Sequence, residues 1–199
     1  MDQKKVRSAP GRTSQGPGGK GLRCWGTMKK VLAIILMGGF IGCINQPIYV
    51  EAHGLSQTSY EDGIPNNIRE YCEIIGHEYD ICPEILEAIA YHESRFLPEV
   101  TNKNCYGLMQ VNVKVHKERI EKYDWTADDM FDAYKNITVA ADYLAELYET
   151  YGDDNPIVLM LYSGSSWKTI EKYKEYGFLT PYVDDILKRS AQYERIHGK

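Results

Sequence analysis

One glutamate in this chain occupies a position that helical periodicity assigns to the protein core. The residue is Glu93, and the repeat of a helix places it on one face with Leu86, Ile89, Ala90 and Leu97. Partial burial disfavours the charged form of a carboxyl group and raises its pKa. A carboxyl group with a raised pKa is suited to act as a general acid near neutral pH. In a second interpretation, Glu93 lies at the edge of this face and reaches solvent or pairs with His92, Arg95 or a lysine.

Further short motifs follow along the chain. In order, the series is Glu93-Ser94-Arg95-Phe96, Tyr106-Gly107-Leu108-Met109-Gln110-Val111-Asn112, Asn136-Ile137 with Ala140-Ala141-Asp142-Tyr143-Leu144, Leu161-Tyr162-Ser163-Gly164, and Thr180-Pro181-Tyr182-Val183. This series resembles the catalytic domain of lytic transglycosylases, the soluble lysozyme-like type, in the compact form common in phage and Gram-positive proteins. The resemblance runs from about Asn66 to about Tyr193. Each motif is weak alone, but the whole series at fitting spacings is specific.

The resemblance implies a mainly α-helical, lysozyme-like domain with a catalytic cleft that acts on peptidoglycan glycan strands. The bond cleaved would be the β-1,4 linkage between N-acetylmuramic acid and N-acetylglucosamine. By the same resemblance, Glu93 first protonates this bond and then accepts a proton from the muramoyl C6 hydroxyl, which closes a 1,6-anhydro ring. This reaction uses one carboxylate and needs no cofactor.

Glycosidases that use water usually need a second carboxylate across the sugar ring. Between Glu93 and Gly107 the sequence offers only Glu99. Four aspartates gather farther on, at Asp124, Asp128, Asp129 and Asp132. Such a cluster is typical of a helix N-terminus or a solvated surface. Two alternatives stay open: a lysozyme-type hydrolase of the same fold, and a non-catalytic component that binds the cell wall or serves in assembly.

The matching motif positions suggest roles for the residues around the acid. Ser94 either bonds to substrate or orients the carboxylate, unless it is an ordinary surface hydroxyl of the helix. Gly107 permits close approach of the backbone, and Leu108 and Met109 are expected to line the cleft. A role of Met109 in the core is equally open. Gln110 is expected to bind sugar or nearby backbone.

Two tyrosines, Tyr162 and Tyr182, resemble the family tyrosines that approach the catalytic glutamate. The family commonly has Ala-Tyr-Asn-x-Gly where this chain has Leu161-Tyr162-Ser163-Gly164. Ser163 can donate and accept a hydrogen bond, but it reaches less far than an asparagine. Substrate positioning at that subsite therefore stays open, which also keeps the non-catalytic alternative open.

The N-terminal part of the chain has the composition of an extension followed by a targeting segment. Residues 1–27 are basic and rich in Gly and Pro, so we expect them to be disordered. Residues 28–52 begin with lysines and continue with an apolar run, as a signal peptide or a membrane anchor does. Three fates are open: cleavage before His53, retention of residues 31–50 as a membrane tether, and lipidation at Cys43. All three place the domain outside the cytoplasm, secreted to the cell wall or anchored facing outward.

A linker over residues 53–64 leads into one catalytic domain over residues 65–199, within which no repeat or second boundary appears. A loop or short strand turn is expected between Phe96 and Gly107. A capping box is expected at Thr126 and Asp129, and Asn136 is expected to cap the helix that follows it. The helices expected from periodicity and end signals cover residues 65–75, 83 to beyond Glu93, 136–151, 155–162, 166–176 and 181–197.

The charge balance argues against nucleic acid as a partner. The whole chain has a formal net charge of −5, and residues 1–27 carry six basic residues against one acidic, so the remainder stands at −10. An acidic domain has no electrostatic attraction toward nucleic acid or anionic wall polymers. Its ligand must therefore be held by a groove, or its location by a tether. A phage or conjugation machine is a candidate host; its identity and the choice between exo and endo action stay open.

Three cysteines, Cys72, Cys82 and Cys105, remain after removal of a signal. An oxidising compartment permits one disulfide among them and leaves one thiol, and the pairing stays open. The chain has no Cys-x-x-Cys, and His92-Glu93 lacks the second histidine of a zinc protease motif. We therefore expect no metal site.

Overall fold

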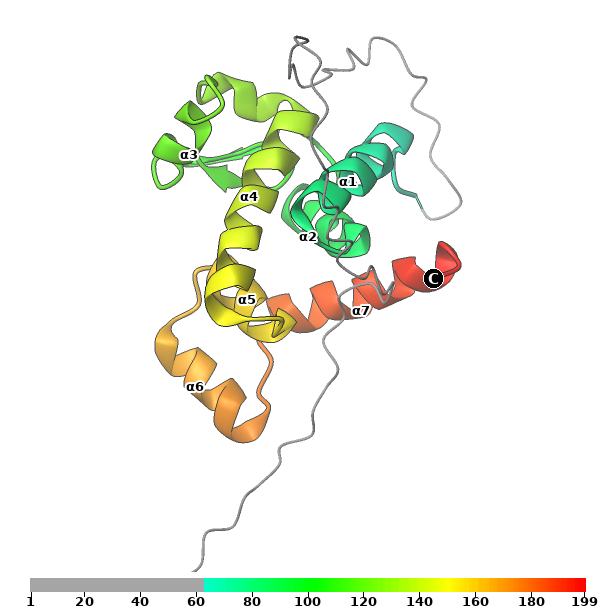
Figure 1. The fold of residues 1–199 in the computed structure, drawn as a ribbon, viewed down its shortest axis with the longest axis vertical. Helices are drawn as coiled ribbons and strands as arrows, with labels where there is room; N and C mark the ends of the chain where they lie inside the picture. The colour runs from blue at the N-terminus through cyan, green and yellow to red at the C-terminus, as the bar shows by residue number, and fades with distance from the viewer. Residues whose placement is uncertain (1–62) are drawn as a thin grey trace, which may run out of the picture.

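The computed structural model describes residues 63–199. The predicted extension, the signal or anchor segment and most of the predicted linker lie outside the described residues. The described chain forms seven α-helices, one 3-10 helix and a small three-stranded sheet (Figure 1). No helix within residues 63–199 combines the length and the apolar character needed to cross a membrane. The prediction of a mainly α-helical domain is confirmed.

In chain order, the helices are α1 (Asn66–Tyr79), α2 (Pro83–Ser94), α3 (Lys117–Glu121), η1 (Asp128–Phe131, 3-10), α4 (Ala133–Tyr151), α5 (Asn155–Tyr162), α6 (Trp167–Tyr176) and α7 (Pro181–Ile196). The strands are β1 (Thr101–Asn102), β2 (Cys105–Tyr106) and β3 (Val111–Asn112). The predicted bounds of the last three helices are confirmed to within one residue at each end. Ile64, which the sequence analysis placed in the linker, is fully buried in the core.

Helix α2 lies at the centre of the helical packing. It packs against both α1 and α7, while α4 packs against α1 and α5 (Figure 1). Leu86, Ile89 and Ala90 of α2 are fully buried, so the predicted apolar stripe is confirmed as far as Ala90. The next position of the same face is Glu93, which this packing places beside the core.

Helix α2 begins at Pro83, a residue favoured in the first turn, and ends at Ser94. Arg95 and Phe96 have φ angles of 56° and 64°, in the left-handed region, so the helix does not continue past them. The prediction that Leu97 extends the inward stripe is wrong, because Leu97 is 58% exposed and Phe96 turns into the core instead. Glu93 therefore stands in the last turn of the helix, at the edge of the core.

After α2 the chain forms an antiparallel sheet with the strand order β1-β2-β3. In its register, Tyr106 of β2 lies opposite Thr101 of β1 and Val111 of β3. The prediction of a short strand turn before Gly107 is confirmed. Residues 107–110, hereafter the 107–110 loop, connect β2 to β3 and carry the Gly-Leu-Met-Gln motif.

The prediction that Asn136 caps a helix is wrong. Helix α4 begins earlier, at Ala133, and the side chain of Asp132 caps it by accepting a hydrogen bond from the Lys135 backbone N–H at 2.9 Å. A signal for a helix start was therefore present at Asp132, and Asn136 lies one turn inside the helix.

Asn136 instead ties the 107–110 loop to α4. Its Oδ1 accepts a hydrogen bond from the Met109 backbone N–H at 2.7 Å. Its Nδ2 donates to the carbonyl oxygens of Tyr106 at 2.9 Å and of Met130 at 2.8 Å. Asn136 is fully buried, and a buried amide that is satisfied at both ends holds its partners in one arrangement.

Two other predicted helix signals act differently in the structure. Helix α1 runs past Gly76, the predicted end, and stops at Asp80, whose φ is 55°. Gly76 serves close packing, because a Cβ there would lie 2.7 Å from the Ile81 carbonyl oxygen. The predicted capping box forms, with the Thr126 N–H donating to Asp129 Oδ2 at 2.8 Å, but the element that follows is the short η1.

Candidate active site

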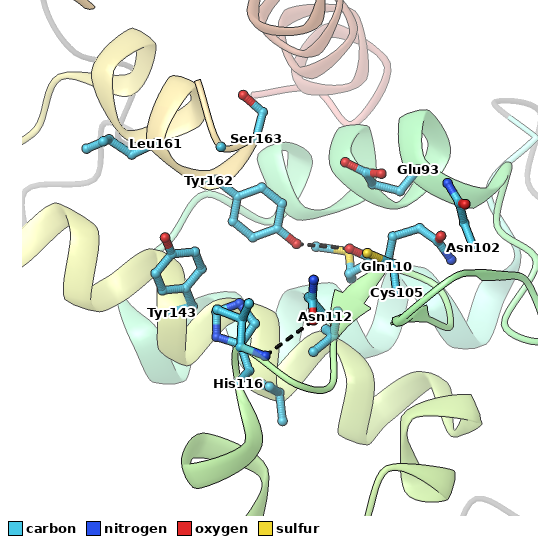
Figure 2. A pocket seen from close by; sticks show the side chains of 15 residues that line it. Glu93, Asn102, Cys105, Gln110, Asn112, His116, Tyr143, Leu161, Tyr162 and Ser163 are labelled. Carbon is cyan, nitrogen blue, oxygen red and sulfur yellow. Dashed lines mark hydrogen bonds between the residues drawn. The ribbon is translucent and has the colours of Figure 1, made fainter. Parts of the chain in front are cut away.

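A cavity of about 380 Å³ lies between the end of α2, the sheet, the middle of α4 and the end of α5 (Figure 2). This volume is within the usual range for a small-ligand site. The side chains and glycines that line it are Glu93, Asn102, Cys105, Met109, Gln110, Val111, Asn112, Val115, His116, Val139, Tyr143, Leu161, Tyr162, Ser163 and Gly164. Among these described residues, Glu93 is the only carboxylic acid.

Glu93 has the electrostatic environment of a proton donor. Burial raises the pKa of its carboxyl group, while the Tyr182 hydroxyl and the charge of His92 offset part of that rise. The carboxyl group nevertheless lines the cavity, so a ligand can reach it. Glu93 thus lies at the edge of the apolar face, as the second interpretation expected, and it is half-buried rather than fully solvated.

Two tyrosines approach Glu93 from different helices. Tyr162, on α5, donates its hydroxyl to the Met109 carbonyl oxygen at 3.1 Å, and burial together with the negative charge of Glu93 raises the pKa of its phenol (Figure 2). Tyr182, on α7, has a buried hydroxyl that no acceptor in the described chain meets at good hydrogen-bond geometry. The hydroxyl nevertheless lies close enough to Glu93 to lower the pKa of that carboxyl group.

The 107–110 loop forms one wall of the cavity. Met109 is held by Asn136 through its N–H and by Tyr162 through its carbonyl oxygen. Gln110 donates from Nε2 to the carbonyl oxygens of Val100 at 3.0 Å and Gly107 at 2.9 Å, so its amide is fixed beside the cavity. This wall is rigid on the side that faces Glu93, as a site that positions a reacting group requires.

The protonated form of a half-buried carboxyl group, beside a cavity with rigid polar walls, can deliver a proton to a bound ligand. The sequence motifs predict the family in which such an acid occurs. Residues 70–180, more than half of the chain, match the family model described as Transglycosylase SLT domain. This chain belongs to that family.

Solved structures share the fold of this SLT domain. A structure of the 70 kDa soluble lytic transglycosylase from Escherichia coli matches with a TM-score of 0.58 and 17% sequence identity. It covers 68% of this chain and 25% of its own chain. An inactive mutant of the lytic transglycosylase Slt from Pseudomonas aeruginosa matches with a TM-score of 0.57, 16% identity, and coverages of 65% and 24%.

This chain thus spans about a quarter of the length of these two proteins. At such identities the likeness concerns the fold. No curated protein matches the chain in sequence.

The structure brings most of the predicted site residues of the SLT domain together. Met109, Gln110, Tyr162 and Ser163 line the cavity with Glu93, and the buried hydroxyl of Tyr182 faces the same carboxyl group. Tyr182 itself is not among the residues that line the cavity. The Ser163 hydroxyl donates to the Met160 carbonyl oxygen at 2.9 Å, and it remains at the cavity surface.

Three predicted site residues lie behind the cavity wall. Ser94 is buried, and its hydroxyl donates to the Ala90 carbonyl oxygen at 3.1 Å, so the reading of Ser94 as a substrate or carboxylate ligand is wrong. Leu108 is fully buried and packs in the core, so it does not line the cleft as predicted. Gly107 permits a close approach, as predicted, but the group that approaches is the protein's own Met130 carbonyl.

The sequence analysis assigned no role to several cavity residues, among them Asn102, Asn112, His116 and Tyr143. His116 packs against Tyr143 with ring centroids 4.6 Å apart, and Tyr143 lies 5.9 Å from Tyr162. These rings extend the cavity away from Glu93 and offer faces against which a sugar can pack. The one sequence signal for Tyr143 was its place in the third motif.

The acidic residues considered as second carboxylates lie elsewhere. Glu99 and Asp124 are exposed, and neither lines the cavity. Asp129 is engaged by Lys135 and Thr126, and these hydrogen bonds lower its pKa to about 2. Asp128 and Asp132 are exposed as well. None of these aspartates reaches the described cavity.

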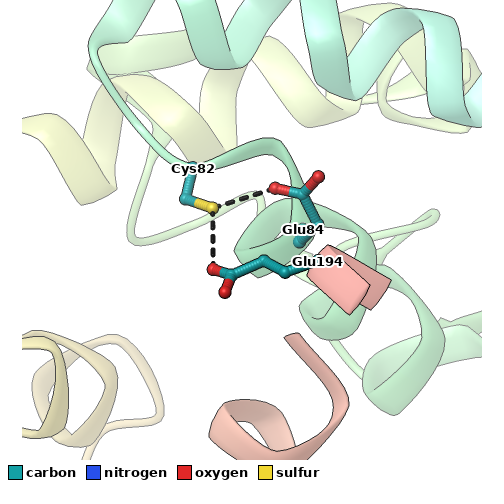
Figure 3. Close-up of side chains that lie close together, drawn as sticks. All are labelled: Cys82, Glu84 and Glu194. Atoms are coloured by element: carbon teal, nitrogen blue, oxygen red, sulfur yellow. Dashed lines mark hydrogen bonds between the residues drawn. The ribbon is translucent and has the colours of Figure 1, made fainter. Parts of the chain in front are cut away.

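A second cluster of polar groups lies where the end of α7 meets the start of α2 (Figure 3). The Cys82 thiol donates to Glu84 Oε2 at 3.0 Å and to Glu194 Oε1 at 3.6 Å. Lys199 Nζ and His197 Nδ1 lie 2.7 Å and 2.9 Å from Glu84 Oε1. Burial alone would raise the pKa of Glu84, but these hydrogen bonds lower it to about 2.

This cluster fastens the C-terminus to α2. Cys82, Glu84 and Glu194 could together offer three ligands to a metal ion. A metal ion there would be repelled by the charge of Lys199, so we assign no metal site to this cluster. In the described chain no disulfide joins Cys72, Cys82 and Cys105 to one another.

Glu87, beside this cluster, makes folding stability depend on pH. It is fully buried, its carboxyl oxygens have no hydrogen-bond partner among the described residues, and burial with the charge of Glu84 raises its pKa to about 8. The pKa of Glu87 is thus higher in the folded state than in the unfolded state. The contribution of Glu87 to the free energy of unfolding is therefore complete below pH ~4.5, and it is lost as the pH rises through about 8.

Replacing Glu87 with glutamine should remove this loss. Because glutamine mimics the neutral acid, Glu87→Gln should gain unfolding free energy relative to the wild type between pH 5 and 9, on the order of 3 kcal/mol. Urea denaturation at each pH measures the difference. Glu78→Gln, at an exposed position of α1, is the matched control and should leave the unfolding free energy within about 0.5 kcal/mol of the wild type. A constant offset between the Glu87 variant and the wild type would contradict the assignment.

Proposed function

We propose that this SLT domain is a peptidoglycan lytic transglycosylase that cleaves the β-1,4 bond between N-acetylmuramic acid and N-acetylglucosamine. The observation that carries the proposal is the cavity with one carboxylic acid, Glu93, whose pKa is raised by burial. A site with a single acid suits a reaction in which one group serves first as acid and then as base.

In the proposed reaction, protonated Glu93 donates its proton to the bridging oxygen as the bond to C1 breaks. The resulting carboxylate is then stabilised by the Tyr182 hydroxyl and by the charge of His92, both of which lower the pKa of Glu93. The carboxylate next removes the proton of the muramoyl C6 hydroxyl, whose oxygen attacks C1. This step regenerates the acid and releases a 1,6-anhydromuramoyl end.

The residues that line the cavity also support a reaction with one acid and base. The described cavity holds no second carboxylate that could activate a water molecule on the opposite side of the sugar. The fixed amide of Gln110 and the rings of Tyr143 and Tyr162 are available to bind sugar hydroxyls and faces. Ser163 would contact the sugar where the family commonly has asparagine.

We further propose that the domain acts outside the cytoplasm, because peptidoglycan lies there. Residues 28–52 would bring it there, as a cleaved signal or as a tether through residues 31–50. A phage or conjugation machine is the kind of assembly in which we propose that the domain opens the wall. The N-terminal segments lie outside the described residues, so the sequence alone supports these two proposals.

The product decides between this reaction and hydrolysis. Digestion of purified sacculi should release muropeptides that end in 1,6-anhydro-N-acetylmuramic acid, about 18 mass units lighter than hydrolysed ones and resistant to borohydride. Mass spectrometry before and after reduction measures both properties. A chitin oligomer, which lacks muramic acid, serves as the control and should be a poor substrate. Predominantly reducible ends would show that water attacks and that the hydrolase alternative is correct.

A further inference from the structure

His92, the residue before Glu93 on α2, joins two residues of α7. Its Nδ1 lies 2.9 Å from Asp185 Oδ2. Its ring meets the ring of Tyr182 edge-on, with centroids 4.7 Å apart and an angle of 74° between the planes. The His92 imidazole thus contacts both the Asp185 carboxylate and Tyr182, the tyrosine that faces Glu93.

The α7 side of this contact is well fixed. Tyr182 and Asp185 are three residues apart, so they share one face of the helix. Asp185 Oδ1 also accepts a hydrogen bond from Arg189 Nη2 at 3.2 Å, and the Arg189 guanidinium lies over the Tyr91 ring at 3.9 Å. The carboxylate that holds His92 is therefore itself held from a second side.

The orientation of the Tyr182 side chain depends on the groups that pack against its ring. Its hydroxyl meets no hydrogen-bond partner within the described chain at good geometry, although it lies close enough to Glu93 to lower the pKa of that carboxyl group. A phenol without a strong hydrogen bond is oriented by whatever packs against its ring. The imidazole edge of His92 is such a contact, and it comes from the same helix as the acid.

We propose that the His92–Asp185 pair positions Tyr182, so that the phenol hydroxyl is held toward the Glu93 carboxyl group. The inference rests on the proposed role of Glu93 as acid and base. His92 and Asp185 are then positioning residues that act through Tyr182.

Several titratable groups face Glu93 and can affect the pKa of its carboxyl group. They are His92 from α2, Tyr182 from α7, Tyr162 from α5 and Cys105 from β2. Of these described groups, only His92 carries a positive charge when protonated. Loss of the imidazole removes that charge and frees the Tyr182 ring, and both changes destabilise the Glu93 carboxylate.

A double-mutant cycle tests whether Asp185 acts through Tyr182. On sacculi, Tyr182→Phe should lower kcat about ten-fold and Asp185→Ala about five-fold, with KM within about two-fold in both. The double variant should be no slower than Tyr182→Phe, because the hydroxyl that Asp185 helps to aim is already gone. Asp184→Ala, at the neighbouring carboxylate paired with exposed Lys188, is the matched control and should retain the wild-type rate. Multiplicative effects, or Asp185→Ala within two-fold of the wild type, would overturn the proposal.

A second measurement does not depend on turnover. Carbon-13 NMR titration of the Glu93 carboxyl in the wild type and in His92→Gln should show a rise in its pKa of about half a unit or more in the variant. Glutamine can still bond to Asp185, so the tie between α2 and α7 persists. Loss of the imidazole charge alone also raises this pKa, so the same titration is repeated in the Tyr182→Phe background, where His92→Gln should raise the pKa by less. An equal rise in both backgrounds, or an unchanged pKa in the wild-type background, overturns the positioning role. A wild type without activity on sacculi would reject the proposed function instead, and the titration would still decide this inference.

Discussion

Glu93→Gln is expected to lower the release of muropeptides from sacculi by at least about two orders of magnitude. Glutamine is nearly isosteric with glutamate, so the fold should persist, but it cannot deliver a proton to the bridging oxygen. No other carboxylic acid among the described residues lines the cavity to replace it. Initial rates at equal enzyme concentration measure the effect, and the melting temperature confirms that the variant is folded.

Glu99→Gln is the matched control for this experiment. Glu99 follows α2 closely in sequence, is exposed and lies outside the cavity, so its variant should keep a rate within about two-fold of the wild type. If Glu93→Gln kept more than a tenth of the wild-type rate, another group would supply the proton.

Gly107→Ala is expected to destabilise the folded domain by about 3 kcal/mol or more. Gly107 has a φ of 76°, and a Cβ there would lie 2.0 Å from the Met130 carbonyl oxygen and 2.5 Å from Asn136 Nδ2. Both of these groups are part of the tie that holds the 107–110 loop. Urea denaturation followed by circular dichroism measures the loss of stability.

Gly164→Ala separates backbone strain from the clash. Gly164 has nearly the same φ, 72°, but nothing lies within 4 Å of an added Cβ. Its variant should lose only about 1 kcal/mol, the cost of a left-handed residue that has a side chain. Equal losses in the two variants would mean that the packing around Gly107 is looser than the structure shows.

Local sequence patterns predict the helical fold and the place of the acid well. The apolar spacing of Leu86, Ile89 and Ala90 makes α2 bury one face, and Glu93 follows on that face by geometry alone. Prolines and glycines at the ends of α5 and α7 act within their own segments, so their signals are readable without tertiary contacts.

The parts that the sequence does not reveal depend on contacts between distant segments. Asn136 has the residue type of a helix cap, and only the arrival of the 107–110 loop gives its amide buried partners. Leu97 fits the helical stripe, but left-handed Arg95 and Phe96 end the helix before it. His116 and Tyr143 meet the cavity only after the sheet and α4 are packed. Apart from the place of Tyr143 in a family motif, no local pattern marks them.

The interlock between Gly107 and Asn136 also constrains how this site can evolve. An added side chain at position 107 would occupy the space of the Asn136 amide, and a smaller residue at position 136 would leave the Met109 N–H and two carbonyl oxygens unpaired. A substitution at either position alone would therefore disturb the 107–110 loop, which forms one wall of the cavity. In diverging descendants of this chain, the two positions should persist together or be replaced together, although 28 residues lie between them in the sequence.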